Sequence, residues 1–325
     1  MWQKSLEHYL SSETPLPKII VIYGPTACGK TGLSLEVAQA VEKCGYAPHI
    51  ISTDSRQIYR GLDIGTGKIT EAEMRGIPHH MIDIIDPSEK YSMVDFRRWV
   101  DALDLFSVIS TKGEILPWQS KMSRSTRHDR NQIIPIICWW TWLYIDAILY
   151  DMDYPENPPD WKYREELEEI RQKEWNEVLW KMLEAVDPEY AHELEVGNYR
   201  YVMRGLEVIR DTGKSKRDSH DTKKPRFSPL FLTPYTDSEE NRKTLYQNID
   251  NRVKNMFNTW LLEEVEYTIA KFSSHCPGLT TIGYREVVEH FEWLHTLEET
   301  IALVAQHSRN YAKRQITWNK KYACI

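Results

Sequence analysis

A glycine-rich segment near the start of the chain constrains its fold more than any other feature. Residues 24–31 read G-P-T-A-C-G-K-T and match the pattern G-x-x-x-x-G-K-[ST] in full. The apolar run at 18–23 before it has the composition of a buried parallel strand, and helical composition follows over 33–41. A second apolar run occupies 49–52. The start of the chain therefore predicts a βαβ unit with a phosphate-binding loop after its first strand.

The rest of the chain alternates strand-like and helical patterns. Further strands are expected at 133–138 and 229–232, and three helices are expected after the last strand, the final one opening with the capping-box pair Thr296 and Glu299. Helical patterns also dominate the middle of the chain, over 163–185, from 187 onward and over 198–213. We predict an α/β fold, with a P-loop parallel sheet flanked by helices and a helical insertion domain. The core would span 17–152 and 206–325, the insertion 153–205, and the polar segment 111–130 would be a surface loop.

Composition narrows the class of protein. The 325 residues are 41% hydrophobic and 27% charged, which is typical of a globular protein. No apolar run approaches the roughly 20 residues that a membrane span needs, and residues 1–18 lack the apolar segment of a secretory signal. Five scattered cysteines form no C-x-x-C pair, so we predict reduced thiols and no zinc site. We expect a cytoplasmic monomer without a membrane partner.

The glycine-rich segment has the residues that a phosphate site needs. Its glycines let backbone N–H groups turn toward an anion, and the helix that follows adds partial positive charge. Lys30 contributes a full charge, and the Thr31 hydroxyl can ligate Mg²⁺. The predicted ligand is a di- or triphosphate, contacted by every residue of the loop: Gly24, Pro25, Thr26, Ala27, Cys28, Gly29, Lys30 and Thr31. The motif does not fix the chemistry, because kinases, ATPases and a few transferases share it.

An aspartate follows the second strand. Asp54 comes two residues after Ser52, at the carboxyl end of that strand, where open α/β sheets place their ligands. A carboxylate there can bind Mg²⁺ or accept a proton. The alternative is that Asp54 or Ser55 caps a helix.

The C-terminal segment has the charge pattern of an RNA contact. The net charge of the chain is -7, yet residues 300–325 contain no acidic side chain. On a helix, Arg309 and Lys313 share one face, and Tyr311 and Trp318 stand seven residues apart. Such a face suits phosphate contacts beside an aromatic platform for a base. The alternative is a solvated helix whose basic end complements its own dipole.

Six blocks of sequence resemble the tRNA dimethylallyltransferase family of bacteria. They follow one another in family order over most of the chain: G-P-T-A-C-G-K-T, I-I-S-T-D-S-R-Q-I-Y-R-G-L-D-I-G-T-G-K, I-P-H-H-M-I-D-I-I-D-P, L-E-V-I-R-D-T-G-K, I-G-Y-R-E and Y-A-K-R-Q-I-T-W. The resemblance implies a prenyltransferase that uses Mg²⁺ and two substrates, dimethylallyl diphosphate and tRNA. The loop would hold the diphosphate, and the adenosine 3′-adjacent to the anticodon would be flipped into a channel to receive the dimethylallyl group on N6.

The resemblance also assigns roles to residues. It implies that Asp54 is the general base, that Lys30, Thr31 and Mg²⁺ stabilise the departing diphosphate, and that Arg252 reaches the same diphosphate, with Arg242 as a weaker candidate. It implies tRNA contacts at Asp54, Ser55, Arg56, Gln57, Thr141, Arg200, Arg204, Arg309, Lys313, Arg314, Gln315 and Trp318. Tyr201 stands where the family usually has an arginine, and Arg200 could substitute for it.

Tryptophans replace glycines of the family at six positions. The family has G-G-T-G-L-Y after its third strand, where this chain has Trp139, Trp140 and Trp142, and the other replacements are Trp175, Trp260 and Trp293. The chain has 12 Trp and only 14 Gly, whereas glycine is ordinarily about 7% of residues. We hypothesise that the gene comes from an organism that decodes UGA as glycine and that these positions were read as tryptophan. If the indoles are native, we expect a distorted tRNA channel and poor activity.

Three alternative functions remain open. An isopentenyltransferase acting on free adenine nucleotides would share the phosphate loop and Asp54, although the R-Q-I-T-W block favours tRNA. A P-loop nucleotide kinase or ATPase would transfer or hydrolyse the γ-phosphate of ATP. A catalytically impaired tRNA-binding protein follows if the tryptophans are native.

Overall fold

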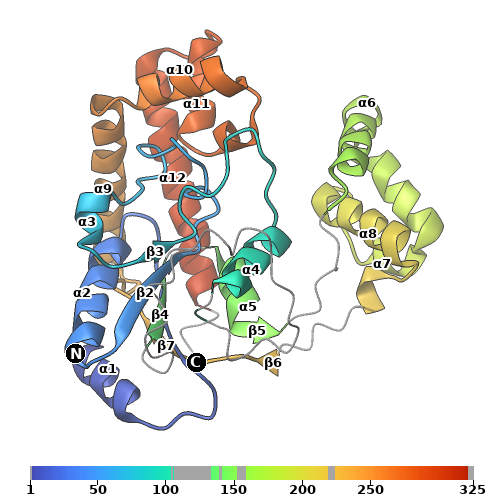
Figure 1. The fold of residues 1–325 in the computed structure, drawn as a ribbon. Helices are drawn as coiled ribbons and strands as arrows, with labels where there is room; N and C mark the ends of the chain where they lie inside the picture. The colour runs from blue at the N-terminus through green and yellow to red at the C-terminus, as the bar shows by residue number, and fades with distance from the viewer. Residues whose placement is uncertain are drawn as a thin grey trace. The chain divides into compact units, whose positions relative to one another are not determined.

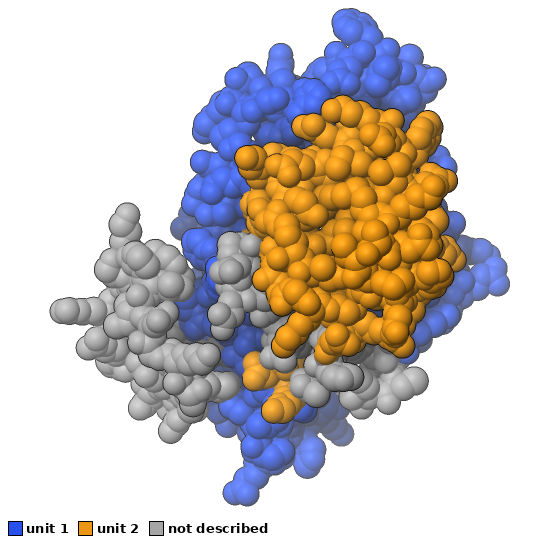
Figure 2. Space-filling model, turned by 90° about the vertical axis from the view of Figure 1, so that its right-hand side faces the viewer, with its two compact units in different colours: residues 1–91, 96–149, 225–325 blue, residues 92–95, 150–224 orange. Residues whose placement is uncertain are grey.

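The chain divides into two compact units. The computed structural model describes residues 2–103, 105, 133–138, 141–151, 159–218 and 224–320. The first unit comprises residues 1–91, 96–149 and 225–325, and the second comprises 92–95 and 150–224 (Figure 2). The helical insertion expected over 153–205 lies within the second unit.

A parallel five-stranded sheet forms the centre of the first unit, as the sequence predicts (Figure 1). The strands lie in the order β3-β2-β4-β1-β7. Ile20 of β1 pairs with Ile136 of β4 on one side and with Leu230 of β7 on the other. The strand bounds are β1 (Lys18–Ile22), β2 (Ala47–Ser52), β3 (His79–His80), β4 (Ile133–Cys138) and β7 (Ser228–Leu232).

Helices bury the two faces of this sheet. Val37 and Val41 of α2 (Lys30–Lys43) are fully buried beside the apolar side chains of β1 and β2. Leu6 and Leu10 of α1 (Trp2–Ser11) join the same core. Before residue 150 the described part of the chain also contains the helices α3 (Glu71–Met74), α4 (Met93–Ala102) and α5 (Trp142–Leu149). The strands are therefore buried on both faces, which explains their continuous apolar composition.

Four α-helices follow β7 in the described part of the chain, so the prediction of three was wrong. They are α9 (Glu239–Asn258), α10 (Leu261–Phe272), α11 (Tyr284–Phe291) and α12 (Leu297–Asn319). The capping box at the start of α12 is confirmed, because the Thr296 and Glu299 side chains each accept a hydrogen bond from the other residue's backbone N–H. Apolar residues of α12 pack on α9, and near its end α12 contacts the loop that follows β1.

The second unit is helical and has its own core. Its helices are α6 (Trp161–Val186), α7 (Pro188–His192) and α8 (Tyr199–Thr212), close to the predicted bounds. Leu179 and Leu183 of α6 pack with Val202 and Leu206 of α8. The short strands β5 (Tyr150–Asp151) and β6 (Lys224–Pro225) form a two-stranded sheet where the chain enters and leaves this unit. The segment 111–130 lies outside the described residues. Among those described, no helix is both long and apolar enough to cross a membrane.

Candidate active site

The glycine-rich loop connects β1 to α2 and leaves backbone donors available. Gly24 has φ 150°, and a Cβ there would lie 2.7 Å from the Cys28 sulfur, so the turn requires glycine. Within the described part of the chain, the backbone N–H groups of Ala27 and Gly29 donate to no acceptor. The Lys30 ammonium, only 5% exposed, donates to the Pro25 carbonyl over 2.7 Å. The loop thus has free amides beside a buried cation, as an anion site needs.

The C-terminal helix supports this loop from the other side. The side-chain oxygen of Gln315, on α12, accepts a hydrogen bond of 2.6 Å from the backbone N–H of Thr26. Gln315 is 1% exposed. The R-Q-I-T-W block therefore contributes a contact that fixes the phosphate loop, and a contact of Gln315 with tRNA stays a prediction.

Asp54 lies at the carboxyl end of β2, close to three cations. The backbone N–H of Arg56 donates to its Oδ1 over 2.8 Å, whereas Oδ2 accepts no hydrogen bond from the described residues. Burial raises the pKa of the Asp54 carboxyl above its ordinary value, and the nearby charges of Arg56, Lys30 and Arg252 oppose that rise. No helix begins at this residue, so the helix-cap alternative fails. One oxygen of a half-buried carboxylate is thus left to accept a proton.

Arg252, on α9, is one of the three cations near Asp54. Its guanidinium donates to the Thr26 hydroxyl over 3.4 Å and to the Thr66 carbonyl over 3.1 Å. It forms no salt bridge with any carboxylate of the described residues, although burial lowers the pKa of the guanidinium. By contrast, Arg242 on the same helix is held by Asp237 at 2.6 and 2.7 Å. Arg252 therefore keeps its charge available for an anion, and Arg242 does not.

The predicted residues around the carboxylate occupy the same end of the sheet. Gln57 is fully buried and donates to the Gly67 carbonyl over 3.4 Å. The backbone N–H of Thr141 donates to the Thr53 carbonyl over 3.1 Å. Thr141 therefore lies next to the residue that precedes Asp54. Ser55 and Arg56 are half-buried next to them.

Sequence reasoning missed the position of Tyr311. This side chain was expected on an RNA-binding surface, but it lies near the catalytic candidate: burial, followed by the negative charge of Asp54, raises the pKa of Tyr311 to about 12. Its phenol therefore stays protonated at neutral pH and can donate a hydrogen bond in this pocket. The only sequence signal was its place four residues before Gln315 on one helix face.

The basic residues of α12 are partly engaged within the protein. Arg309 forms an ion pair with Asp250 of α9. The Lys313 ammonium lies 6.0 Å from the ring centre of Tyr246, and the Arg314 guanidinium lies 5.6 Å from that of Tyr311. Trp318 is 48% exposed. An exposed indole beside these cations suits contact with RNA.

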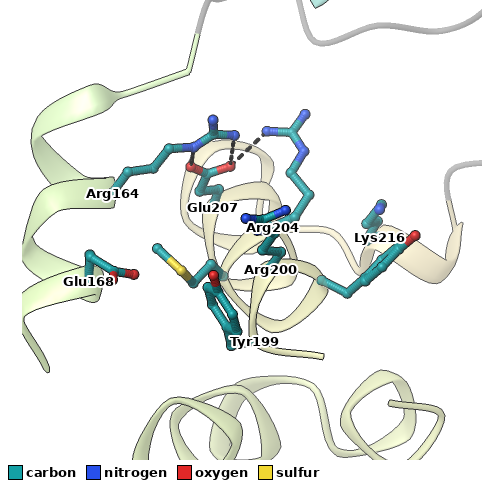
Figure 3. Close-up of a pocket in the computed structure, with 9 residues that line it drawn as sticks. Arg164, Glu168, Tyr199, Arg200, Arg204, Glu207 and Lys216 are labelled. Carbon is teal, nitrogen blue, oxygen red and sulfur yellow. Dashed lines mark hydrogen bonds and ion pairs between the residues drawn. The ribbon is translucent and has the colours of Figure 1, made fainter. Parts of the chain in front are cut away.

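Arg200 and Arg204 belong to the second unit, where they line a cavity of about 690 Å³ (Figure 3). Glu207 is buried and forms ion pairs with Arg204 and Arg164. Arg200 forms no salt bridge with the described residues and lies 5.8 Å from the Tyr199 ring centre. This cavity is therefore cationic and partly aromatic, which suits a phosphate or a base.

Trp142 is accommodated without strain in the first unit. It is 5% exposed, its ring centre lies 5.7 Å from that of Tyr23, and its indole N–H donates to the Asn319 side chain over 3.2 Å. Its backbone is not left-handed. Trp139 and Trp140 lie outside the described residues.

The donor set near the loop fits magnesium better than zinc. No group of three His, Cys, Asp or Glu side chains that could hold a metal ion occurs among the residues described. Thr31 is the second residue of α2, next to Lys30, and is half-buried. Mg²⁺ keeps several waters and is commonly bound by one or two protein oxygens together with substrate phosphates. The Thr31 hydroxyl is therefore a suitable protein ligand for it.

The sequence of this chain is similar to known protein families and to curated proteins. The family "IPP transferase" matches residues 57–322, and the family "Isopentenyl transferase" matches residues 17–85. A protein named tRNA dimethylallyltransferase from Bacillus subtilis is 36% identical over 92% of this chain and 87% of its own length. The protein of that name from Geobacillus thermodenitrificans is 37% identical over 93% of this chain and 87% of its own.

Solved structures agree with these relatives. The full-length tRNA isopentenylpyrophosphate transferase from Bacillus halodurans is 33% identical, with a TM-score of 0.59 over 93% of this chain and 86% of that one. A eukaryotic dimethylallyltransferase, solved while acting on tRNA, is 26% identical, with a TM-score of 0.71 over 93% of this chain and 69% of that one.

Proposed function

The chain belongs to the IPP transferase family, and on that premise we propose that it transfers the dimethylallyl group of dimethylallyl diphosphate to N6 of the adenosine 3′-adjacent to the tRNA anticodon, releasing diphosphate. One observation supports this most: among the described residues, a loop with free amides, an arginine without a carboxylate partner and a half-buried aspartate lie together at the carboxyl end of the sheet. The names of the relatives given above identify tRNA as their substrate. We propose that this chain acts on tRNA in the cytoplasm.

Each group in the pocket has a chemical role in this reaction. The Oδ2 of Asp54 takes a proton from the N6 amine as that nitrogen bonds to the first carbon of the dimethylallyl group. The bond from that carbon to the diphosphate oxygen breaks at the same time, and negative charge collects on the departing diphosphate. The loop amides, Lys30 and Arg252 face that charge and stabilise it.

Magnesium is the cofactor that fits this chemistry. The Thr31 hydroxyl would hold it together with diphosphate oxygens. When bound, Mg²⁺ would neutralise part of the charge of the diphosphate.

The adenosine must leave the tRNA stack to reach Asp54. Flipping a base costs a few kcal/mol, which hydrogen bonds to the base edge offset. Near Asp54, the Tyr311 phenol can supply such a bond. We propose that Arg309, Lys313, Arg314 and Trp318 contact the tRNA on α12, and that Arg200 and Arg204 do so in the second unit.

The reaction itself is the test of this proposal. The protein is incubated with dimethylallyl diphosphate, Mg²⁺ and unmodified tRNA, and the tRNA is then digested to nucleosides. We expect an N6-prenylated adenosine that depends on all three components. Prenylation of free adenine nucleotides in preference to tRNA would instead support an adenylate isopentenyltransferase. Transfer or hydrolysis of the γ-phosphate of ATP, with no use of dimethylallyl diphosphate, would contradict the proposal.

A further inference from the structure

A glutamate outside the pocket holds a cluster of backbone donors. Glu264, on α10, accepts hydrogen bonds from the backbone N–H groups of Asp63 and Ile64, both over 2.9 Å, and of Gly65 over 3.3 Å. The Tyr284 hydroxyl donates to the same carboxylate over 2.6 Å. Burial raises the pKa of Tyr284 well above its ordinary value, so this hydroxyl keeps its proton. Four donors thus converge on one carboxylate.

The segment held in this way continues directly into the active site. The carbonyl of Thr66 accepts the 3.1 Å hydrogen bond from Arg252, and the carbonyl of Gly67 accepts the 3.4 Å bond from Gln57. The packing is close, because a Cβ at Gly67, where φ is 59°, would collide with the Arg252 guanidinium. Arg252 in turn reaches the Thr26 hydroxyl of the phosphate loop.

From these contacts we propose that Glu264 is a positioning residue for the transfer reaction. Its carboxylate fixes residues 63–65, and the next two carbonyls, of Thr66 and Gly67, hold the Arg252 guanidinium beside the phosphate loop and the Gln57 amide in place. The inference rests on the proposed function for the identity of the substrate. The hold on Arg252 beside the phosphate loop follows from the geometry alone.

A second anchor keeps this segment folded without Glu264. The Lys68 ammonium is almost fully buried and forms ion pairs of 2.5 Å with Asp63 and Asp83, as well as a 2.8 Å hydrogen bond to the Tyr59 carbonyl. A change at Glu264 is therefore expected to loosen the position of Arg252 more than to unfold the protein.

The full-length Glu264→Gln variant tests the proposal. A neutral amide matches the carboxylate in shape but offers one acceptor oxygen to four donors. We expect the Kd for inorganic diphosphate with Mg²⁺, measured by calorimetry, to rise by about tenfold or more. We also expect kcat for prenyl transfer to fall, with the Kd for tRNA unchanged. Glu263→Gln, at an exposed neighbouring position on α10, is the matched control and should behave as wild type.

Two further outcomes decide the matter. If Glu264→Gln lowers only the melting temperature, and the folded protein retains wild-type diphosphate affinity and kcat, the proposal is overturned. If that variant does not fold, Tyr284→Phe removes a single donor, and a severalfold loss of diphosphate affinity is expected, whereas no loss would overturn the proposal. Calorimetry measures diphosphate binding without any prenyl transfer. If the proposed function is wrong, the wild-type protein will form no prenylated nucleoside, and that result is separate from the binding result.

A different observation concerns three of the tryptophans that replace family glycines. Trp175, Trp260 and Trp293 have φ of 71°, 78° and 63°, a region that bulky side chains rarely adopt. These residues are 77%, 69% and 93% exposed, so burial of the indoles offsets little of the strain. None of the other described tryptophans has a positive φ.

At each of these positions the backbone has a conformation that glycine usually adopts. At Trp293, the N–H donates to the His290 carbonyl and the next N–H donates to the Glu289 carbonyl, which together form the helix ending that usually carries glycine. Trp260 lies between two helices: it follows Thr259, the C-cap of α9, and is itself the N-cap of α10. Trp175 interrupts α6 with φ 71° and ψ 175°, a combination found essentially only for glycine.

We infer that the native protein has glycine at these three positions, encoded by UGA codons that the source organism reads as glycine. The gene tests this directly: UGA is expected at codons 175, 260 and 293, and UGG is expected at codon 180. UGG at the first three would overturn the inference. The backbone of Trp142 does not require glycine, so the inference does not extend to that position on geometric grounds.

Stability provides an independent test. Changing Trp175, Trp260 or Trp293 to glycine is expected to raise the ratio of folded to unfolded protein by about fivefold at each position, because the left-handed strain is removed. The matched control is Trp180→Gly, in α6, where the indole N–H donates to the carbonyls of Ala191 and Leu194 over 2.9 and 3.1 Å. That change should lower the ratio about tenfold or more. Denaturant unfolding measures both, and destabilisation by all three glycines would contradict the inference.

Discussion

Replacing Asp54 by asparagine is expected to lower the single-turnover rate of prenyl transfer by roughly 100-fold or more, while tRNA still binds. The amide keeps the shape of the side chain and can still accept the 2.8 Å hydrogen bond from the Arg56 backbone, but it cannot take a proton from N6. Rapid-quench kinetics with saturating tRNA and dimethylallyl diphosphate measure the rate, and filter binding measures tRNA affinity.

The control for this change is another aspartate of the first unit. Asp86 forms a surface ion pair of 3.2 Å with Arg60 and lies outside the pocket. Asp86→Asn should leave the rate at the wild-type level. A rate for Asp54→Asn close to that of wild type would remove Asp54 from the role of base.

Replacing Arg252 by glutamine is the second large effect, with an expected fall in kcat of about 100- to 1,000-fold. This guanidinium is poised between the Thr26 hydroxyl and the Thr66 carbonyl and has no carboxylate partner among the described residues, so its charge faces the leaving diphosphate. The glutamine variant should also bind inorganic diphosphate more weakly, which calorimetry measures.

Arg242 offers a matched control on the same helix. Its guanidinium is neutralised by Asp237 at 2.6 and 2.7 Å, outside the pocket. Arg242→Gln should therefore leave both kcat and diphosphate affinity unchanged. Equal losses in the two variants would indicate that α9 was disturbed as a whole and that Arg252 has no special role.

Local sequence patterns predicted the central strands, the phosphate loop and the helix bounds, because each of these depends on residues that are neighbours in the chain. The apolar runs around Ile20 and Ile50 became central parallel strands because a strand buried on both faces must be apolar throughout. The glycine-rich motif, with its flanking strand and helix, placed the phosphate loop correctly. The predicted range 198–213 matched α8 for a similar reason, since Gly213 ends the helix in a left-handed conformation, whereas the Asn198 side chain makes no capping hydrogen bond.

What the sequence did not predict depends on contacts between distant segments. The bond from Thr26 to Gln315 joins residues 289 apart, and the bond from Asp63 to Glu264 joins residues 201 apart. A glutamate that accepts backbone N–H groups leaves no pattern, since the donors are present in every residue except proline. The prediction of three helices after β7 failed although the Pro277-Gly278 pair between α10 and α11 is a local turn signal.

If the Asp54 carboxylate acts as the base, the single-turnover rate must depend on its ionisation, and the pH dependence of that rate measures this. Because burial raises the pKa of Asp54, the ionised form is lost as pH falls through that raised value. The wild-type rate should therefore decline on the acid side at a pH above about 3.9, the ordinary pKa of aspartate. The low residual rate of Asp54→Asn should show no such decline. An acid-side decline of the same midpoint in both proteins would contradict the account.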